Sequence, residues 1–361
     1  MASSCLFSNA AYPLMRRTLL VPSLACAPYF RGWYHGFESY GCKGVLVGKI
    51  LFVGVTCADV VINVDRLPRT AEDVVVYGQQ MTLGGCAFNA FAIAHALDEP
   101  AILFSPVGSG AFGDFVRSGL AVEGVPVAVD NPNMDNGCCY CFVEPGGERT
   151  FVAYHGADYH YEPEWFDALD MDQIDFVYVC GLEVEDPTGP VVVDFLERRC
   201  ACKKIFFTPS PRPDSVPDGL LNRIYDLHPV LHFNGDEAKA CAVRLDAAFD
   251  PDKDDAVARA CAVLRERTGN AVFATLGKEG CYYDEGGRTG TVAGIDASVV
   301  DTIGAGDSHI GTLMACLHRG DEVEEALACA NRVAAAVVST AGAHLPVEDV
   351  LRAAQGTRLG D

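Results

Sequence analysis

The stretch that decides the interpretation of this chain is Asp301-Thr302-Ile303-Gly304-Ala305-Gly306-Asp307. An amphipathic pattern follows it and predicts a helix over 305–319, so three small residues lie where that helix begins. Free backbone amides at a helix start point away from the helix and carry a partial positive charge. Because Gly304 and Gly306 have no side chains, an anion can approach these amides closely. The stretch therefore predicts an anion-binding loop.

The last residue of the stretch, Asp307, falls within the first turn of the predicted helix. An anion pocket beside a carboxylate suits phosphoryl transfer, because the amides stabilise charge on the phosphate while the carboxylate accepts a hydroxyl proton. The alternative is structural: Asp307 would then only be an acidic partner of the helix dipole. The complete heptapeptide favours the chemical interpretation.

Apolar runs of strand length alternate with helical patterns from Lys49 onward. The predicted strands are 50–55, 101–107, 125–129, 176–180, 204–208, 231–234 and 271–276. The predicted helices are 86–97, 112–121, 191–200, 254–268, 305–319 and 322–340. This alternation predicts an α/β fold with a mainly parallel sheet that is covered by helices on both faces.

Some β-rich pieces do not fit this alternation. They are 60–64, 74–77, and the hairpin formed by 139–143 and 150–154 around Pro145-Gly146-Gly147. We expect them to form a small separate β-sheet, built from about 57–83 and 138–154, that acts as a lid. One domain over 49–350 would then be followed by a tail, 351–361.

The first 48 residues differ in character from the rest and are predicted to be a poorly ordered extension, or to follow from a start codon upstream of the working one. Met15-Arg16-Arg17 with the apolar residues after it also resembles a short signal peptide. Pro22 and Pro28 interrupt that pattern and no clean cleavage site follows, so the signal peptide is the lesser alternative. The segment is too short to span a bilayer.

Charge and cysteine usage restrict the partners and the compartment. The chain of 361 residues has 27 Lys and Arg against 49 Asp and Glu, a formal net charge of −22. An acidic protein is a poor partner for nucleic acid, and we expect neither nucleic acid nor membrane binding. The 16 cysteines are scattered and do not form a pair of CxxC motifs, as expected for buried thiols in a reducing cytoplasm.

A second glycine motif indicates a different kind of binding site. Gly108-Ser109-Gly110-Ala111-Phe112-Gly113 has the G-x-G-x-x-G spacing, and Asp130 follows about 20 residues on, which is the context of an NAD-binding site. An NAD-dependent oxidoreductase is therefore the alternative from a different class. In a chain this rich in glycine, a tight turn between a strand and a helix is the preferred interpretation.

Two stretches together resemble one known family. Asp301–Asp307 matches the DTxGAGD signature, and Gly84-Gly85-Cys86-Ala87-Phe88-Asn89 matches the GGxxxN signature, of the PfkB/ribokinase family of carbohydrate kinases. The likeness runs from about residue 48 to 346. It implies a ribokinase-like three-layer α/β/α fold with a β-sheet lid, and ATP-dependent phosphorylation of a sugar hydroxyl. It also implies a homodimer formed through the lid, and nucleosides remain an alternative class of substrate.

The resemblance further assigns roles to individual residues. Asp307 corresponds to the catalytic base, and the anion hole comprises Gly304, Ala305 and Gly306. The substrate-binding positions are Asp59, Gly84, Gly85 and Asn89. The nucleotide-binding positions are Asn234, Thr275, Gly277, Gly280 and Asn331. Glu237 would organise Mg²⁺ through water, and Asp301 would line a monovalent-cation site for K⁺ that some members have.

Several positions depart from the family pattern. Gly110 stands where the family usually has Asp, and Gly235 replaces the first acidic residue of the family's NExE pattern. Thr208-Pro209-Ser210-Pro211-Arg212 replaces a typical DPNxR. None of these touches the expected base or anion hole, so the substrate rather than the chemistry stays open. For Arg149 and Arg212, a substrate contact and a solvated charge remain alternatives, while His95, His155 and His160 are expected to be structural or exposed.

Overall fold

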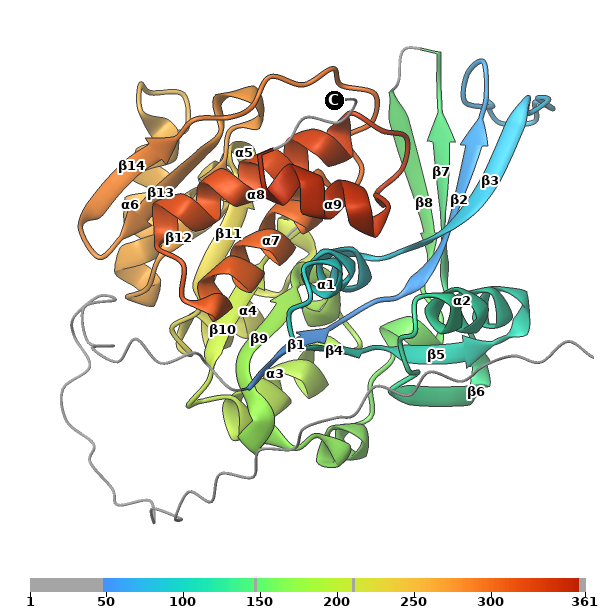
Figure 1. The fold of residues 1–361 in the computed structure, drawn as a ribbon, viewed down its shortest axis with the longest axis horizontal. Helices are drawn as coiled ribbons and strands as arrows, with labels where there is room; N and C mark the ends of the chain where they lie inside the picture. The colour runs from blue at the N-terminus through green and yellow to red at the C-terminus, as the bar shows by residue number, and fades with distance from the viewer. Residues whose placement is uncertain (1–47, 146–147, 210–211, 357–361) are drawn as a thin grey trace, which may run out of the picture. The chain divides into compact units, whose positions relative to one another are not determined.

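The computed structural model describes residues 48–145, 148–209 and 212–356 (Figure 1). The predicted N-terminal extension, apart from Gly48, lies outside the described residues, as do residues 357–361 of the predicted tail. The predicted boundary at residue 350 falls within the last helix, α9 (Val347–Ala354), which continues past it.

The centre of the fold is an eight-stranded sheet with the order β14-β13-β12-β11-β10-β9-β1-β4. Its strands are β1 (Lys49–Val53), β4 (Ala101–Phe104), β9 (Ile174–Cys180), β10 (Lys204–Thr208), β11 (Val230–Asn234), β12 (Val272–Thr275), β13 (Cys281–Glu285) and β14 (Arg288–Val292). The strands from β12 to β4 are parallel, which confirms the predicted mainly parallel sheet.

The antiparallel hairpin β13–β14 at one edge was not predicted. Glu285 pairs with Arg288, so only Gly286 and Gly287 connect the two strands. Both glycines have positive φ, of 63° and 101°, as a two-residue hairpin turn requires. The Gly-Gly pair was therefore an available signal for this turn.

Both faces of the central sheet are apolar, because successive strand residues point to opposite sides. On β1, Ile50 and Phe52 join one core cluster, and Leu51 and Val53 join the other. The first cluster is covered by α1 (Cys86–Ala96), α7 (Ala305–Arg319), α8 (Val323–Val338) and α9. The second is covered by α3 (Gly189–Arg199), α4 (Asp218–Tyr225), α5 (Gly235–Leu245) and α6 (Ala256–Thr268). The result is the expected three-layer arrangement, to which α4, α5 and α9 are additions.

A four-stranded sheet with the order β3-β2-β7-β8 is separate from the central sheet (Figure 1). Its strands are β2 (Cys57–Asn63), β3 (Gly78–Gly84), β7 (Cys138–Val143) and β8 (Arg149–Tyr154). We call it the small sheet, and it confirms the predicted β appendage. The predicted strand over 74–77 is wrong, since the strand begins at Gly78 and the apolar residues Val75, Val76 and Tyr77 before it are exposed.

The predicted strands 101–107 and 125–129 have the wrong bounds. The chain leaves the central sheet after β4, and β5 (Pro106–Ser109) pairs instead with β6 (Val129–Asp135) in a two-stranded parallel sheet. Helix α2 (Gly110–Val122) follows β5 directly. A Cβ on Gly113 would lie 2.0 Å from the carbonyl oxygen of Gly108, and Arg117 donates to that same oxygen over 2.6 Å. These contacts favour the tight-turn interpretation of 108–113 over a dinucleotide site.

Candidate active site

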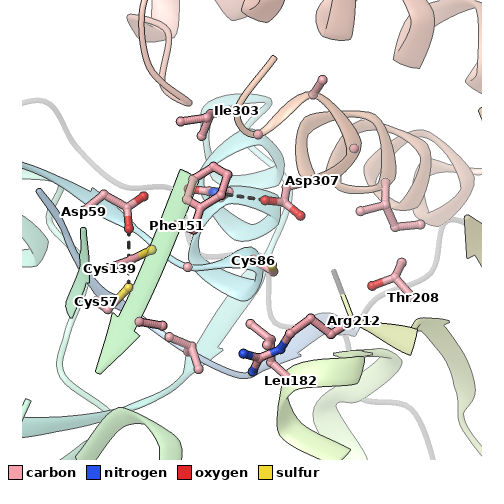
Figure 2. Close-up of a pocket in the computed structure, with 18 of the residues that line it drawn as sticks. Cys57, Asp59, Cys86, Cys139, Phe151, Leu182, Thr208, Arg212, Ile303 and Asp307 are labelled. Atoms are coloured by element: carbon pink, nitrogen blue, oxygen red, sulfur yellow. Dashed lines mark hydrogen bonds between the residues drawn. The ribbon is translucent and has the colours of Figure 1, made fainter. Parts of the chain in front are cut away.

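A cavity of about 770 Å³ lies at the carboxyl ends of three neighbouring parallel strands, whose last residues Thr208, Asn234 and Thr275 line it. Ligands of open α/β sheets bind at this edge. Most of the residues predicted to form a site line this cavity: Asp59, Gly85, Asn89, Asn234, Glu237, Thr275, Gly277, Gly304, Ala305, Gly306 and Asp307. Gly84, Gly280, Asn331 and Asp301 are not among its lining residues. Figure 2 shows part of this lining.

The 301–307 loop turns into α7 at Gly304, which has a φ of +72° and whose carbonyl accepts from the Ser308 amide over 2.7 Å. That left-handed backbone favours glycine. A Cβ on Gly306 would meet no atom within 4 Å, so the backbone at this position faces open space. The loop therefore presents uncovered backbone to the cavity at the start of α7, as the anion-binding prediction requires.

Asp307 lies in the first turn of α7, and Nδ2 of Asn89 from α1 donates to its Oδ2 over 2.9 Å (Figure 2). Burial raises the pKa of Asp307 to about 6, and the negative charge of Glu237 adds to this shift. Hydrogen bonds from Asn89 and the Cys86 thiol oppose it. A carboxylate with this pKa is ionised at neutral pH and is still basic enough to accept a proton.

Asn89 has a second polar atom of interest. Its Oδ1 is buried and has no hydrogen-bond partner among the described residues. Buried polar atoms are nearly always bonded, so an orphan at the wall of a cavity marks a place for a ligand donor. Asn89 follows Gly85, whose φ of +103° lets the chain turn into α1. A Cβ on Gly85 would lie 2.3 Å from the Val55 carbonyl oxygen, which explains the need for glycine there.

Asp59 reaches the cavity from strand β2 of the small sheet (Figure 2). Burial raises its pKa to about 6, and the charge of Asp307 acts in the same direction, while the Cys57 thiol opposes it by donating over 3.6 Å. Gly84 lies behind this carboxylate: a Cβ there would be 2.0 Å from Oδ2 of Asp59. Gly84 therefore makes room for Asp59 and does not itself face the cavity.

Asn234 and Glu237 form a reciprocal cap at the start of α5. Oδ1 of Asn234 accepts from the Glu237 amide over 2.9 Å, and Oε2 of Glu237 accepts from the Asn234 amide over 2.9 Å. The cap holds the Glu237 carboxylate at the cavity. Within residues 48–145, 148–209 and 212–356, no group of three or more metal-binding side chains occurs. A single carboxylate in the same cavity as the open backbone at Gly306 is compatible with Mg²⁺, which proteins bind through one or two carboxylates together with water and phosphate oxygens.

Two predicted nucleotide-binding residues shape the site from behind. Gly280 has a φ of +103°, and a Cβ there would lie 2.0 Å from the Val292 carbonyl oxygen. Asn331 on α8 donates from Nδ2 to the carbonyl oxygens of Val292 and Ala293 over 3.1 and 3.0 Å. Its Oδ1 lies 3.2 Å from Nε2 of His309. Asn331 therefore holds the end of β14 and Gly280 packs closely against it, whereas Thr275 and Gly277 reach the cavity.

Asp301 does not fit the monovalent cation that the resemblance implied. Its Oδ1 accepts from the Ile303 amide over 2.9 Å, and its Oδ2 accepts from the Gly342 amide over 2.7 Å. The same Oδ2 forms an ion pair with Nη2 of Arg149 at 2.6 Å. Because these contacts engage both carboxylate oxygens and include a full positive charge, the group is already neutralised.

Several residues at the cavity are not among those predicted to form the site. Asp158 lines it, accepts from the Gly137 amide over 2.5 Å, and has its pKa raised to about 6 by burial. His155, expected to be structural or exposed, also lines the cavity and stacks on Tyr159 with ring centroids 3.9 Å apart. Arg212, for which a substrate contact and a solvated charge were the alternatives, lines it as well and pairs with Glu185 at 2.8 Å. These residues come from irregular segments, where the sequence has no periodic signal.

Glu183 is a further unpredicted acid, fully buried in the short 3-10 helix Gly181–Val184. Its carboxylate accepts from the Val55 amide over 2.8 Å and from the Cys180 amide over 3.2 Å. Burial raises its pKa to about 7, although these hydrogen bonds oppose the shift. Glu183 therefore fastens the end of β1 to the end of β9, directly behind the cavity wall.

None of the helices in the described part of the chain has the length and apolar character needed to cross a bilayer.

Comparisons with known proteins identify the family of this chain. The family profile described as pfkB family carbohydrate kinase matches residues 47–350. An uncharacterized sugar kinase of Escherichia coli strain K12, YegV, is 31% identical over 294 residues, which cover 81% of this chain and 89% of that protein. A ribokinase of Bacillus subtilis is 26% identical over 298 residues, covering 82% of this chain and 94% of that protein.

A solved structure shares the fold. Arabidopsis thaliana ribokinase, complexed with ribose and ATP, superposes with a TM-score of 0.70 at 18% identity, and the match covers 86% of this chain and 99% of that one. The family profile extends through both glycine motifs, and the match to the E. coli relative covers 81% of the chain. The chain therefore belongs to the pfkB family of carbohydrate kinases.

Proposed function

We propose that the protein transfers the γ-phosphate of ATP to a hydroxyl group of a sugar or sugar-like substrate. The observation that carries the proposal is the position of Asp307, a carboxylate with a raised pKa at the open backbone of Gly304–Gly306, inside a cavity large enough for substrates. A base beside an anion site supplies the two functions that phosphoryl transfer requires. The raised pKa of Asp307 places its proton affinity in the range useful near neutral pH.

Substrate binding falls to the groups around Asp307 and the small sheet. The carboxylate of Asp59 accepts from substrate hydroxyls, and the orphan Oδ1 of Asn89 accepts from another. Gly85 lines the same part of the cavity, and its missing side chain leaves room for the Val55 carbonyl that packs against it. The chemistry of this set, with acceptors from two carboxylates and one amide, suits a polyhydroxylated molecule.

In the transfer step, Asp307 accepts the proton of the attacking hydroxyl while that oxygen forms a bond to the γ-phosphorus. The bond from the γ-phosphorus to the β,γ-bridging oxygen breaks, and ADP leaves with the electron pair. The amides of the 304–306 segment stabilise the equatorial phosphoryl oxygens as charge redistributes. After transfer, the proton on Asp307 passes to solvent when the cavity opens.

The nucleotide is held on the other side of the cavity, by Asn234, Thr275 and Gly277. Gly280 and Asn331 support that wall through the end of β14. Glu237 would hold Mg²⁺ through water, and the ion would neutralise phosphate charge and orient the γ-phosphate. The small sheet, which contributes Phe151 to the lining, would exclude water as a lid.

The test is a screen for ADP release with ATP and Mg²⁺ over pentoses, hexoses, sugar acids and nucleosides, because nucleosides are the alternative substrate class. Sugar-dependent ADP release, with phosphate recovered on the sugar by mass spectrometry, is the expected result. ADP release with nucleosides alone would assign the protein to nucleoside phosphorylation. Absence of any acceptor-dependent release would contradict the proposal.

The same proposal includes the setting in which the enzyme works. The exposed apolar side chains Met81, Phe151, Val152 and Tyr154 of the small sheet support a homodimer formed through that sheet. Sedimentation velocity at micromolar concentration tests it, and a monomer would contradict it.

The thirteen cysteines in the described part of the chain are all unpaired, which supports a reducing, cytoplasmic location.

A further inference from the structure

An ion pair connects the small sheet to the 301–307 loop. Nη2 of Arg149, at the start of β8, lies 2.6 Å from Oδ2 of Asp301, and the two side chains are 13% and 3% exposed. A buried pair of this kind differs from a surface salt bridge, because removing either partner leaves an uncompensated charge away from water. The contact therefore links the position of the small sheet to the loop that begins at Asp301.

Asp301 in turn fixes the course of the loop. Its carboxylate accepts from the Ile303 amide within the loop and from the Gly342 amide in the segment after α8. Its own amide donates to the Val338 carbonyl oxygen over 3.2 Å. Asp301 is thus the point where the loop is attached to the end of α8. A charge that holds the Asp301 carboxylate in place also holds the backbone that continues to Gly304.

The surroundings of the pair contain room and polar groups. A second cavity of about 430 Å³ is lined by Arg149, Asp301 and Gly342, and by Asn63, Gln79 and Gln80 from the small sheet. Arg149 also donates from Nη1 to the sulfur of Cys141 over 3.6 Å. The guanidinium is therefore anchored on its own sheet before it reaches across to the carboxylate.

We propose that the Arg149 guanidinium supplies, at Asp301, the positive charge for which other members use a monovalent cation, and that it positions the 301–307 loop from the small sheet. The proposal rests on the proposed function, since the loop is taken as the phosphate site. A guanidinium at 2.6 Å from the carboxylate repels a second cation, and both carboxylate oxygens already accept hydrogen bonds. Phosphoryl transfer by this protein should then not depend on K⁺. Arg149 is a positioning residue, because it acts through Asp301.

The first measurement uses the unaltered protein. Its turnover number and melting temperature are compared in K⁺ and in choline at equal ionic strength, with Mg²⁺ and ATP held constant. The expected result is the same turnover number and the same melting temperature in both salts. A several-fold stimulation by K⁺, or a melting temperature that rises with K⁺ but not with choline, would overturn the proposal.

The second measurement removes the guanidinium. Arg149→Gln should lower the turnover number in choline by about 10- to 100-fold, the range for a displaced catalytic element, with a smaller effect on KM for ATP. K⁺, or guanidinium ion at low millimolar concentration, should restore part of the activity and raise the melting temperature of this variant. Arg149→Lys should lie between the two proteins. Arg198→Gln, which removes an exposed arginine of α3 paired with Asp194, is the control and should leave all values unchanged.

The outcomes separate the two proposals. Full activity of Arg149→Gln in choline, or a loss that neither K⁺ nor guanidinium restores, would overturn the role of Arg149. If Arg149→Gln does not fold, the salt comparison on the unaltered protein and the Arg149→Lys variant still decide. If the unaltered protein phosphorylates no acceptor, the proposed function fails, while the melting temperatures in the two salts continue to test whether a cation binds at Asp301.

Discussion

The side-chain amide of Asn89 donates to Oδ2 of Asp307 over 2.9 Å and so joins α1 to α7. Through this bond, the two glycine-rich motifs of the chain meet at one wall of the cavity. The bond lowers the pKa of Asp307 against the effect of burial, and it leaves Oδ1 of Asn89 as an acceptor without a described partner. The relationship therefore sets both the basicity of the proposed base and its place beside the substrate.

Replacing the proposed base should abolish most of the activity. Asp307→Asn keeps the size of the side chain but removes its ability to accept a proton, so the turnover number should fall by about 10²–10⁴-fold. Nucleotide binding, measured with a fluorescent ATP analogue, should change little. Asp254→Asn at an exposed position before α6 is the control. Unchanged turnover in Asp307→Asn would show that another group takes the proton.

The pH dependence of turnover should follow the ionisation of Asp307. With its pKa raised to about 6, the fraction of ionised base falls as the pH drops through 6, so the turnover number should decline on the acid side of that value. Asn89→Ala removes a bond that lowers this pKa and should move the acid limb to higher pH. Glu237→Gln removes a charge that raises it and should move the limb to lower pH.

These opposite shifts are measured as pH profiles of the turnover number at saturating ATP and acceptor. Neither shift should occur with Asp254→Asn, the exposed control. If both variants moved the limb in the same direction, or left it in place, the limb would belong to a group other than Asp307.

Two glycines in the first turns of different helices, Gly306 and Gly219, provide a test variant and a matched control for the proposed anion hole. A Cβ on Gly306 in α7 or on Gly219 in α4 would meet no atom within 4 Å, so valine at either position should leave the fold intact. Only the Gly306→Val side chain would enter the active-site cavity. We expect its turnover number to fall by about 10²–10³-fold, the effect of losing a donor to the transition state.

The measurement is steady-state kinetics together with thermal unfolding of both variants. Gly219→Val should match the unaltered protein in both. A Gly306→Val enzyme of normal activity and normal melting temperature would show that the phosphoryl group binds elsewhere.

Glu183 should make stability depend on pH. Burial raises its pKa from 4.5 to about 7, so the folded protein binds this proton more tightly than the unfolded chain. The tighter binding of this proton stabilises the folded state fully below pH 4.5, and this stabilisation is lost as the pH rises through 7. The free energy of unfolding should fall by about 3 kcal/mol over this range. Glu183→Gln stays neutral and should not show this loss.

Urea denaturation at pH 5.5 and pH 8 measures this effect. The free energy of unfolding of Glu183→Gln, minus that of the unaltered protein, should be larger at pH 8 than at pH 5.5. The same difference for the exposed control Glu164→Gln should not change with pH. An equal offset at both pH values would indicate that Glu183 stays ionised in the folded state.

The parts of this protein that the sequence predicts are those with a local cause. Gly304, Gly306 and Asp307 are predicted to line a site from one heptapeptide, because a helix start and missing side chains can be recognised over a few residues, and all three line the cavity. The buried parallel strands are likewise predicted by local runs of apolar residues. In contrast, the segment 74–77 has the apolar composition of a strand but precedes β3, and its residues Val75, Val76 and Tyr77 are exposed.

What the sequence does not predict depends on contacts between distant segments. Glu183 lies 128 residues from Val55, and only the folded sheet brings the carboxylate to that amide. The role of Arg149 depends in the same way on Asp301, because a hairpin arginine looks like a solvated charge until its partner is known. The Gly-Gly turn of β13–β14 differs, since its signal was local and had no competing explanation.

The pairing of α1 with α7 has a consequence for biosynthesis. Asn89 and Asp307 are 218 residues apart, so α1 leaves the ribosome long before the helix that covers it has been translated. During that interval α1 lacks α7, whose Ile310 and Leu313 belong to the same core cluster in the finished protein. A chain that ends before α7 would therefore leave apolar side chains of α1 without this cover, and we expect such a fragment to aggregate rather than to act as a weak enzyme.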